Sequence, residues 1–145
     1  MNLVKYLSII SEILFLILYS LPAHAVLGGK VTPLNVEVKS PNCSISRKAL
    51  GRVGVSEFFD EAGNIYGVCW KSTRRVKDLT QILGAKYSPL YAVKMKNAVR
   101  HKGQRFLDIE DSDLTIKMSA SGRSFASCVY DPQQLPEGVS GHEIH

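Results

Sequence analysis

Three cysteines, Cys43, Cys69 and Cys128, carry the most distinctive side-chain chemistry in this sequence of 145 residues. In an oxidising compartment, an odd number of cysteines is typical of one disulfide with a thiol left over, or of a bridge to another chain. Three pairings are open, and three small unbonded core residues are the alternative. We expect Cys69 and Cys128 to bridge two strands and Cys43 to remain free.

Catalysis by Cys69 is the less favoured interpretation. A thiolate nucleophile needs a positively charged, partly exposed environment and usually a histidine. The histidine nearest in sequence, His101, falls in a polar stretch that we interpret as a loop. The motif context of a thiol enzyme is also missing.

Two histidines at the C-terminus, His142 and His145, have Glu143 between them. Their spacing suits one metal ion on a helical turn. No third ligand is near in the sequence, so a solvated tail is the favoured interpretation. We expect neither a metal nor a cofactor.

Four acidic residues, Asp108, Glu110, Asp111 and Asp113, form a second cluster. Paired carboxylates perform glycoside hydrolysis or bind calcium. This spacing lacks the glycine and the distal glutamate of a calcium loop, so a solvated loop edge leading into a strand is favoured. Hydrolase, metalloprotease and phosphate-loop motifs are absent from the sequence, and we expect no enzyme.

The charge pattern is the more informative signal. Between Lys71 and Arg105 there are ten positively charged residues and one negative residue, Asp78. Such polarity raises the local anion concentration and steers acidic partners, although two solvated helices with basic exposed faces would give the same pattern. Specific nucleic-acid readout is not expected. The candidate anion- or partner-binding residues are Lys71, Arg74, Arg75, Lys77, Lys94, Lys96 and Arg100.

A hairpin must position Cys69 and the single tryptophan, Trp70. Asp60-Glu61-Ala62-Gly63 predicts a type I turn with Gly63 in the left-handed region and Asp60 capping it. In that register Phe59 faces Ile65, Phe58 faces Tyr66 and Val55 faces Cys69. One face of the hairpin then carries Phe58, Tyr66, Val68 and Trp70, and residues 44–49 add a third strand to a meander.

Two helices are expected in the basic segment. The N-cap of the first helix is Ser72 or Thr73, and Gly84 ends this helix. Its apolar face consists of Val76, Leu79, Ile82 and Leu83. Ser88-Pro89 reads as the start of the second helix, which runs to Ala98. Residues 99–104 are expected to form a loop.

The last third returns to strands. Residues 114–118 and 123–130 form a hairpin across the turn Ser119–Gly122. The tail from about residue 131 is expected to be an extended strap or a short terminal turn. We therefore predict an α+β fold, with an antiparallel sheet (a three-strand meander plus a C-terminal hairpin) packed with one or two central helices.

The N-terminus predicts export. Lys5 precedes an apolar run, Ile13 to Leu18, and Ala23-His24-Ala25 fits a signal-peptidase site, so we place cleavage after Ala25. The uninterrupted apolar run is shorter than the roughly 20 residues that span a bilayer, although an uncleaved anchor is the alternative. The remaining chain, residues 26–145, is expected to be a single domain without a transmembrane segment, periplasmic or secreted by a bacterium.

Four stretches occur together in the chain: the start Ala25-Val26-Leu27-Gly28-Gly29, "FFDEAGNIYGVCW", "DLTQILG" and "LPEGVSGHEI". Their order and spacing resemble a family of secreted proteobacterial proteins known as domain of unknown function 2844, over essentially the whole mature chain. The resemblance implies a signal peptide and this layout, and it implies no activity. It also implies a small residue, often alanine, in place of Cys69, which argues against a catalytic cysteine.

Taken together, these patterns predict an exported, non-enzymatic envelope protein. It would bind another envelope protein or an anionic envelope component through its basic helical segment. The alternatives are a thiol-dependent or carboxylate-based enzyme, and an assembly protein linked through its unpaired cysteine.

Overall fold

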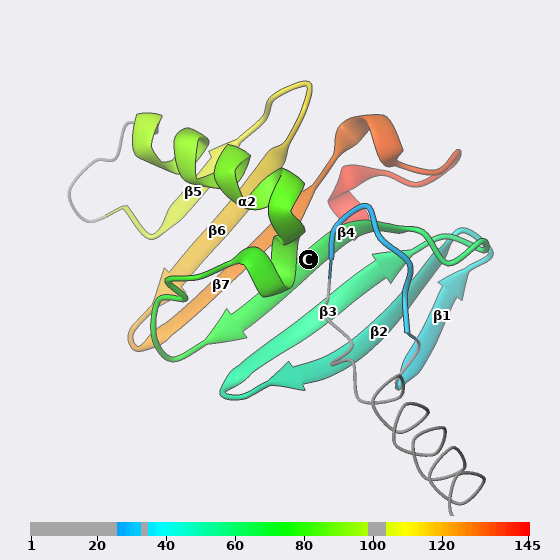
Figure 1. The fold of residues 1–145 in the computed structure, drawn as a ribbon, viewed down its shortest axis with the longest axis horizontal. Coiled ribbons are helices and arrows are strands. Elements are labelled where there is room, and N and C mark those ends of the chain that lie inside the picture. Colours follow the sequence, from blue (N-terminus) through cyan, green and yellow to red (C-terminus); the bar gives the residue numbers. More distant parts are fainter. Residues whose placement is uncertain (1–25, 33–34, 99–103) are drawn as a thin grey trace, which may run out of the picture.

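The computed structural model describes residues 26–32, 35–98 and 104–145 (Figure 1). The described residues form one antiparallel sheet, one long helix and two short 3₁₀ turns. No helix among them is long and apolar enough to cross a membrane. The elements are β1 (Val36–Ser40), β2 (Cys43–Leu50), β3 (Val53–Phe59), β4 (Ile65–Ser72), α2 (Thr80–Asn97), β5 (Phe106–Ile109), β6 (Thr115–Ser121), β7 (Ser124–Tyr130), η1 (Pro132–Gln134) and η2 (Gly141–Glu143).

The sheet joins two meanders. Its strand order is β1-β2-β3-β4-β7-β6-β5, so β1 to β4 form one meander, β5 to β7 form the other, and β4 pairs with β7 between them. The α+β class is confirmed, as are the meander of β2 to β4 and the hairpin of β6 and β7. The two edge strands were not predicted. β1 is exposed at all five residues although its sequence, VEVKS, alternates, and β5 has only four residues.

The register of the central hairpin was predicted correctly only at its tip. Phe59 pairs with Ile65, but a bulge next to this pair places Phe58 opposite Gly67 and Val55 opposite Trp70. Tyr66 is the extra residue, and a bulge of this kind shifts every later pair by one. The predicted face of the hairpin is therefore wrong: Phe58 and Tyr66 lie in one core cluster, whereas Val68 and Trp70 lie in the other.

The turn of this hairpin is as predicted. Gly63 has a φ of 80°, and its N–H donates to the carbonyl of Asp60 at 2.9 Å. The carboxylate of Asp60 accepts from the backbone N–H of Asn64 at 2.8 Å. Glycine adopts this left-handed conformation without steric cost, so the turn sequence alone specifies the bend.

The helix begins later than predicted. Ser72 still belongs to β4, and its hydroxyl donates to the carbonyl of Arg74 at 2.5 Å, so it closes a turn instead of capping a helix. The carboxylate of Asp78 accepts from the N–H of Thr80, where α2 starts. Residues 73–79 are thus a loop, which is a correction, although Leu79 is buried as its apolar pattern predicted.

Gly84 ends the first helical stretch of α2 with a positive φ, as predicted. Its backbone (φ 76°, ψ 174°) is not helical, and a second helical stretch continues beyond the kink to Asn97. Ser88-Pro89 is not the start of that second stretch, because Pro89 lies about one turn inside it. The two expected helices are therefore the two parts of the kinked helix α2, and only the predicted start of the second is wrong.

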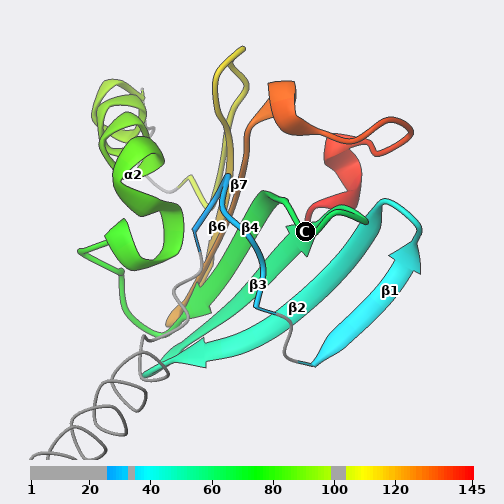
Figure 2. The same cartoon turned by 45° about the vertical axis from the view of Figure 1, so that its right-hand side comes forward.

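The sheet is covered on both faces (Figures 1 and 2). Helix α2 lies over one face, and its residues Ile82, Leu83 and Tyr87 pack with Val68 and Trp70. The segment after β7 lies over the other face, where η1 and η2 form the short turns expected of the tail. Its residue Ile144 is buried in the second core cluster, whose other members are Cys43, Ile45, Phe58, Tyr66, Cys69 and Tyr130.

The N-terminal segment of the described chain packs beside the central hairpin. The N–H of Gly28 donates to the carbonyl of Ile65, and the N–H of Ile65 donates to the carbonyl of Gly29. Leu27 is buried in the core under α2, and a Cβ on Gly84 would lie 2.5 Å from Val26 Cγ1. The residues at the predicted mature start therefore contact both the central hairpin and the kink of α2.

Candidate functional site

A cleft lies between α2 and the half of the sheet formed by β4, β7, β6 and β5, and we call it the α2 cleft. Its volume is about 560 Å³, within the range of roughly 300–1,000 Å³ typical of small-molecule sites. Its lining is Trp70, Ser72, Arg75, Val76, Lys77, Leu79, Ser88, Tyr91, Ala92, Met95, Gln104, Arg105, Phe106, Leu107, Met118, Ala120, Phe125, Ala126 and Ser127.

Strand register divides the sheet side of the cleft into two layers. Ser72 pairs with Phe125, and Phe125 pairs with Ala120, whose N–H donates to the carbonyl of Arg105. Two residues further along the strands, Trp70 pairs with Ser127, and Ser127 pairs with Met118, which pairs with Leu107. We call these the outer layer and the inner layer. Two strand residues separate them by about 7 Å.

Beyond the inner layer the core is closed. Val68, Val129 and Ile116 form the next row across the sheet, and each is fully buried. The ring of Trp70 meets that of Tyr91 edge to face, with centroids 5.7 Å apart. The cleft therefore has a floor of packed side chains and opens toward the outer layer.

Three cations line the cleft. Arg75 and Lys77 come from the loop between β4 and α2, and Arg105 comes from the residue before β5. All three are exposed, and none forms an ion pair within the part of the chain that the structure describes. Unpaired cations beside an apolar cavity create a positive potential at its opening, which attracts anions.

Ser127 is a polar residue in the inner layer. It is 4% exposed, and its hydroxyl has no hydrogen-bond partner among the described residues. A buried hydroxyl without a partner costs about 1–3 kcal/mol, and such groups in native proteins need an explanation. Ser127 also lines the cleft, but its Oγ is covered by protein atoms, so the side chain must turn toward the cleft to meet a bound molecule.

The predicted anion-binding residues do not form one surface. Of the seven, Arg75 and Lys77 line the cleft. Lys71 alternates with Trp70 along β4 and so lies on the opposite face of the sheet. Arg74 and Lys96 are exposed outside the cleft, and Arg100 lies outside the described residues.

Lys94, the seventh of these residues, makes two ion pairs. Its Nζ lies 2.5 Å from Asp111 and 2.7 Å from Asp113, and its side chain is 11% exposed. The hydrogen bond between Lys94 and Asp111 is the main reason that the pKa of Asp111 is lowered and that the pKa of Lys94 is raised. Two members of the acidic cluster thereby connect α2 to the segment before β6. The charge of Lys94 is therefore paired within the fold and is not free to bind an external anion.

Tyr87 fixes the middle of α2. Its buried hydroxyl donates to Asp131 at 2.7 Å and lies 2.9 Å from the amide nitrogen of Gln134. Burial, followed by the interaction with Asp131, raises the pKa of Tyr87. The same carboxylate accepts from the N–H of Gln133, so one acidic side chain connects the helix to the segment after β7.

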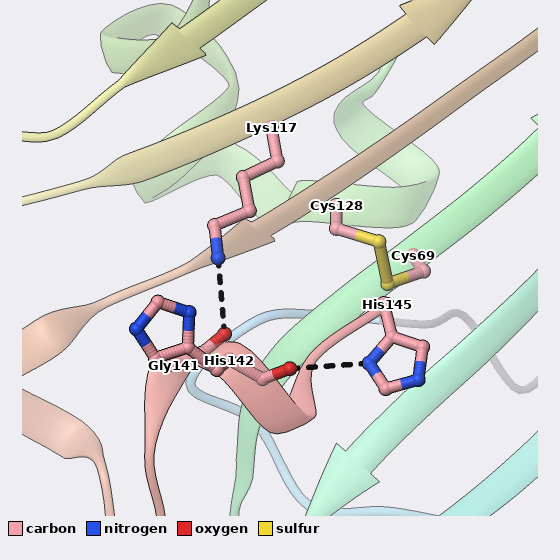
Figure 3. Close-up of a disulfide and its surroundings, with 6 residues drawn as sticks. All are labelled: Cys69, Lys117, Cys128, Gly141, His142 and His145. Atoms are coloured by element: carbon pink, nitrogen blue, oxygen red, sulfur yellow. Dashed lines mark hydrogen bonds between the residues drawn. A yellow bond between two sulfur atoms is a disulfide. The ribbon is translucent and has the colours of Figure 1, made fainter.

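The predicted disulfide is confirmed. Cys69 on β4 and Cys128 on β7 are directly opposite and bonded, and Cys43 is free (Figure 3). Cys43 is only 2% exposed, and a buried thiol is poorly placed for either nucleophilic attack or a bridge to another chain. The proposed histidine neighbour, His101, lies outside the described residues.

The C-terminal histidines lie near the disulfide (Figure 3). The Nδ1 of His145 is 3.2 Å from the carbonyl of His142, and the ammonium of Lys117 donates to the carbonyl of Gly141 at 3.3 Å. The described residues contain no group of three or more metal-binding side chains. The contact of Lys117 with Gly141 connects the final turn to strand β6 of the sheet.

Sequence reasoning missed the cleft itself, and with it Arg105 and Ser127. Arg105 was counted in the basic segment but not selected, because its place in the same cleft as Arg75 and Lys77 depends on strand pairing. Ser127 carries no local signal at all. It becomes notable only because its neighbours across the sheet leave its hydroxyl without a partner.

Comparison with known proteins identifies a family. Neither the curated proteins nor the solved structures contain a significant match to the chain. The sequence model of a family described as "Protein of unknown function (DUF2844)" matches residues 23–144. Because this match covers most of the chain and includes every described strand and helix, the protein belongs to the DUF2844 family.

Proposed function

We propose that this protein is an exported, non-enzymatic envelope protein that binds an anionic envelope component at the opening of the α2 cleft. The observation that carries the proposal is the position of Arg75, Lys77 and Arg105, which come from two segments and border one apolar cavity. Cations at the edge of a cavity bind anionic groups while the cavity accepts an apolar part of the same ligand.

Export is supported by two independent features. The N-terminal sequence has the apolar run and the Ala23-His24-Ala25 pattern of a signal peptide. The bond between Cys69 and Cys128 is typical of proteins that fold in the periplasm or outside the cell, because the cytosol keeps thiols reduced. We infer a periplasmic or secreted bacterial protein that is cleaved after Ala25.

A binding role is favoured over catalysis by the composition of the cleft. Among its described lining residues there is no cysteine, histidine, aspartate or glutamate. These residue types supply most general bases of enzymes, and a serine nucleophile normally needs such a base beside it. Serine, arginine and apolar side chains in this arrangement are suited to holding a ligand.

Vesicle flotation tests the proposal. The mature protein is mixed with vesicles of phosphatidylglycerol and phosphatidylcholine, or of phosphatidylcholine alone, at low and raised salt. We expect it to float only with the anionic vesicles and to be released by salt, since exposed charges are screened within about 10 Å at 0.1 M ionic strength. Failure to float with anionic vesicles at low salt contradicts the proposal.

A matched pair of variants localises the binding. The triple variant Arg75→Ser, Lys77→Ser, Arg105→Ser removes the cations at the cleft. The control Lys39→Ser, Arg47→Ser, Arg52→Ser removes the same number and types of charge from β1, β2 and the β2–β3 turn, outside the cleft. We expect the first variant to lose flotation and the control to keep it. Equal loss in both would show that net charge, and not the cleft, drives binding.

A further inference from the structure

We propose that the α2 cleft accepts a single-chain anionic amphiphile of the acylated glycerol phosphate type. Its phosphate would lie among Arg75, Lys77 and Arg105, its ester or hydroxyl oxygen would meet Ser127, and its chain would lie against Trp70 and Met118. This inference rests on the proposed function and narrows the anionic component to one chemical class.

The walls of the inner layer suit an alkyl chain. Met95 and Met118 approach the cleft from α2 and from β6, and Trp70 and Leu107 complete the apolar surface. Methionine is unbranched and flexible, so it adapts to ligands of irregular shape. A cavity of about 560 Å³ is in the range of one small ligand, which favours one chain.

The charges at the opening define the head group. Arg75, Lys77 and Arg105 line the cleft, with Arg105 in the row of the outer layer, and the described cleft lining contains no carboxylate to oppose them. Arginine presents a planar group of donors that matches phosphate oxygens, and lysine adds a point charge. A phosphate monoester, with more than one negative charge, therefore complements this opening better than a single carboxylate does.

Ser127 determines where a second oxygen must lie. Its unpartnered hydroxyl belongs to the inner layer, about 7 Å along the strands from the layer of Arg105. A simple fatty acid carries both oxygens in its head and would leave this hydroxyl unpaired. In an acylated glycerol phosphate, the ester carbonyl is several bonds from the phosphate and can accept a hydrogen bond from Ser127 when the phosphate is at the opening.

Fluorescence of the single tryptophan provides the assay. Trp70 lines the cleft, so an occupant changes its emission directly. The mature protein is titrated, below the micelle concentration of each probe, with decanoyl glycerol phosphate, decanoate and uncharged monodecanoyl glycerol. We expect saturable one-to-one binding of decanoyl glycerol phosphate, at least about tenfold tighter than either other probe, since each loses one polar contact or charge.

Variants separate occupancy of the cleft from general association. Ala92→Phe places a ring in the cleft, whereas Ala85→Phe adds the same ring on α2 outside the lining. We expect the first to weaken binding of decanoyl glycerol phosphate by more than about tenfold and the second to leave it unchanged. Equal binding by both variants overturns the inference. Thermal unfolding of each variant confirms that it is folded.

Ser127→Ala tests the second oxygen. Loss of one neutral hydrogen bond is expected to weaken decanoyl glycerol phosphate by about 3–10-fold and to leave decanoate unaffected. Equal effects on both probes overturn the assignment of Ser127. If the protein floats with anionic vesicles but Trp70 does not respond to decanoyl glycerol phosphate, this inference fails and the proposed function stands. If neither occurs, both fail.

Discussion

Cys69 and Cys128 lie directly opposite each other on β4 and β7, and their disulfide joins the two meanders of the sheet. The strands of one meander carry the central hairpin, and those of the other carry most of the sheet side of the α2 cleft. The two halves of the cleft, β4 on one side and β7 to β5 on the other, therefore meet at this covalent link.

Removing the disulfide is expected to weaken the fold. The bond closes a loop with a sequence separation of 59 residues, for which loop-closure entropy gives an upper value of about 4 kcal/mol. We predict that Cys69→Ala, Cys128→Ala lowers the free energy of unfolding by about 2–4 kcal/mol in urea denaturation. A reductant should destabilise the wild type similarly and leave the double variant unchanged; a double variant as stable as the oxidised wild type would contradict this role.

Gly84 is expected to tolerate no side chain. Its φ of 76° with ψ of 174° is a region that is essentially restricted to glycine, and a Cβ there would lie 2.5 Å from Val26 Cγ1. We predict that Gly84→Ala lowers the free energy of unfolding by about 2–3 kcal/mol. Gly122→Ala, where a Cβ meets nothing within 4 Å, is the control and should cost less.

The contact with Val26 can be separated from the backbone strain. Adding Val26→Ala to Gly84→Ala removes the methyl groups that collide with the new Cβ, so we expect part of the lost stability to return. A double-mutant cycle measures this coupling. Strictly additive effects would show that the N-terminal segment does not pack against the helix kink.

The buried ion pair of Lys48 and Glu57 predicts a dependence of stability on pH. The Nζ of Lys48 lies 2.7 Å from the Oε1 of Glu57, and the two side chains are 7% and 0% exposed, respectively. Burial outweighs the opposing effect of Lys48 and raises the pKa of Glu57 above its ordinary value of 4.5. The folded state then holds a proton that the unfolded state has released, so stability falls as pH rises from 4.5 through the raised value.

Removing Lys48 should make stability fall more steeply as the pH rises. Lys48→Met leaves the carboxylate of Glu57 buried without its cation, which we expect to cost about 3–5 kcal/mol at neutral pH and less in acid. The double variant Lys48→Met, Glu57→Leu should recover most of the loss and abolish this part of the pH dependence. Urea denaturation at several pH values checks both outcomes, and a pH-independent penalty for Lys48→Met would contradict the account.

Local signals predicted the elements that depend on neighbouring residues. The turn from Asp60 to Gly63 followed from its residue types, and the disulfide was expected because Cys69 and Cys128 both lie in predicted strands. The position of the later strand pairs did not follow, because the bulge at Tyr66 arises from pairing along the whole hairpin. The start of α2 was missed because Ser72 bonds within a turn, a choice that its sequence does not reveal.

The candidate site depended still more on tertiary contacts. Arg75 and Lys77 were among the predicted binding residues and line the cleft, but charge alone did not distinguish them from Lys94, which two aspartates neutralise. The cleft includes the paired residues Trp70 of β4 and Ser127 of β7, which lie more than 40 positions apart in the sequence. No periodicity or motif within either strand predicts that these two residues pair.

The most direct test of the central claim is quenching of Trp70 by an acylated glycerol phosphate that carries bromine atoms on its chain. Bromine quenches tryptophan only at close range, so the signal reports whether the apolar chain lies in the α2 cleft. The account predicts strong, saturable quenching that the unbrominated compound reverses and that Ala92→Phe prevents. Binding of the brominated compound without loss of Trp70 emission would contradict it.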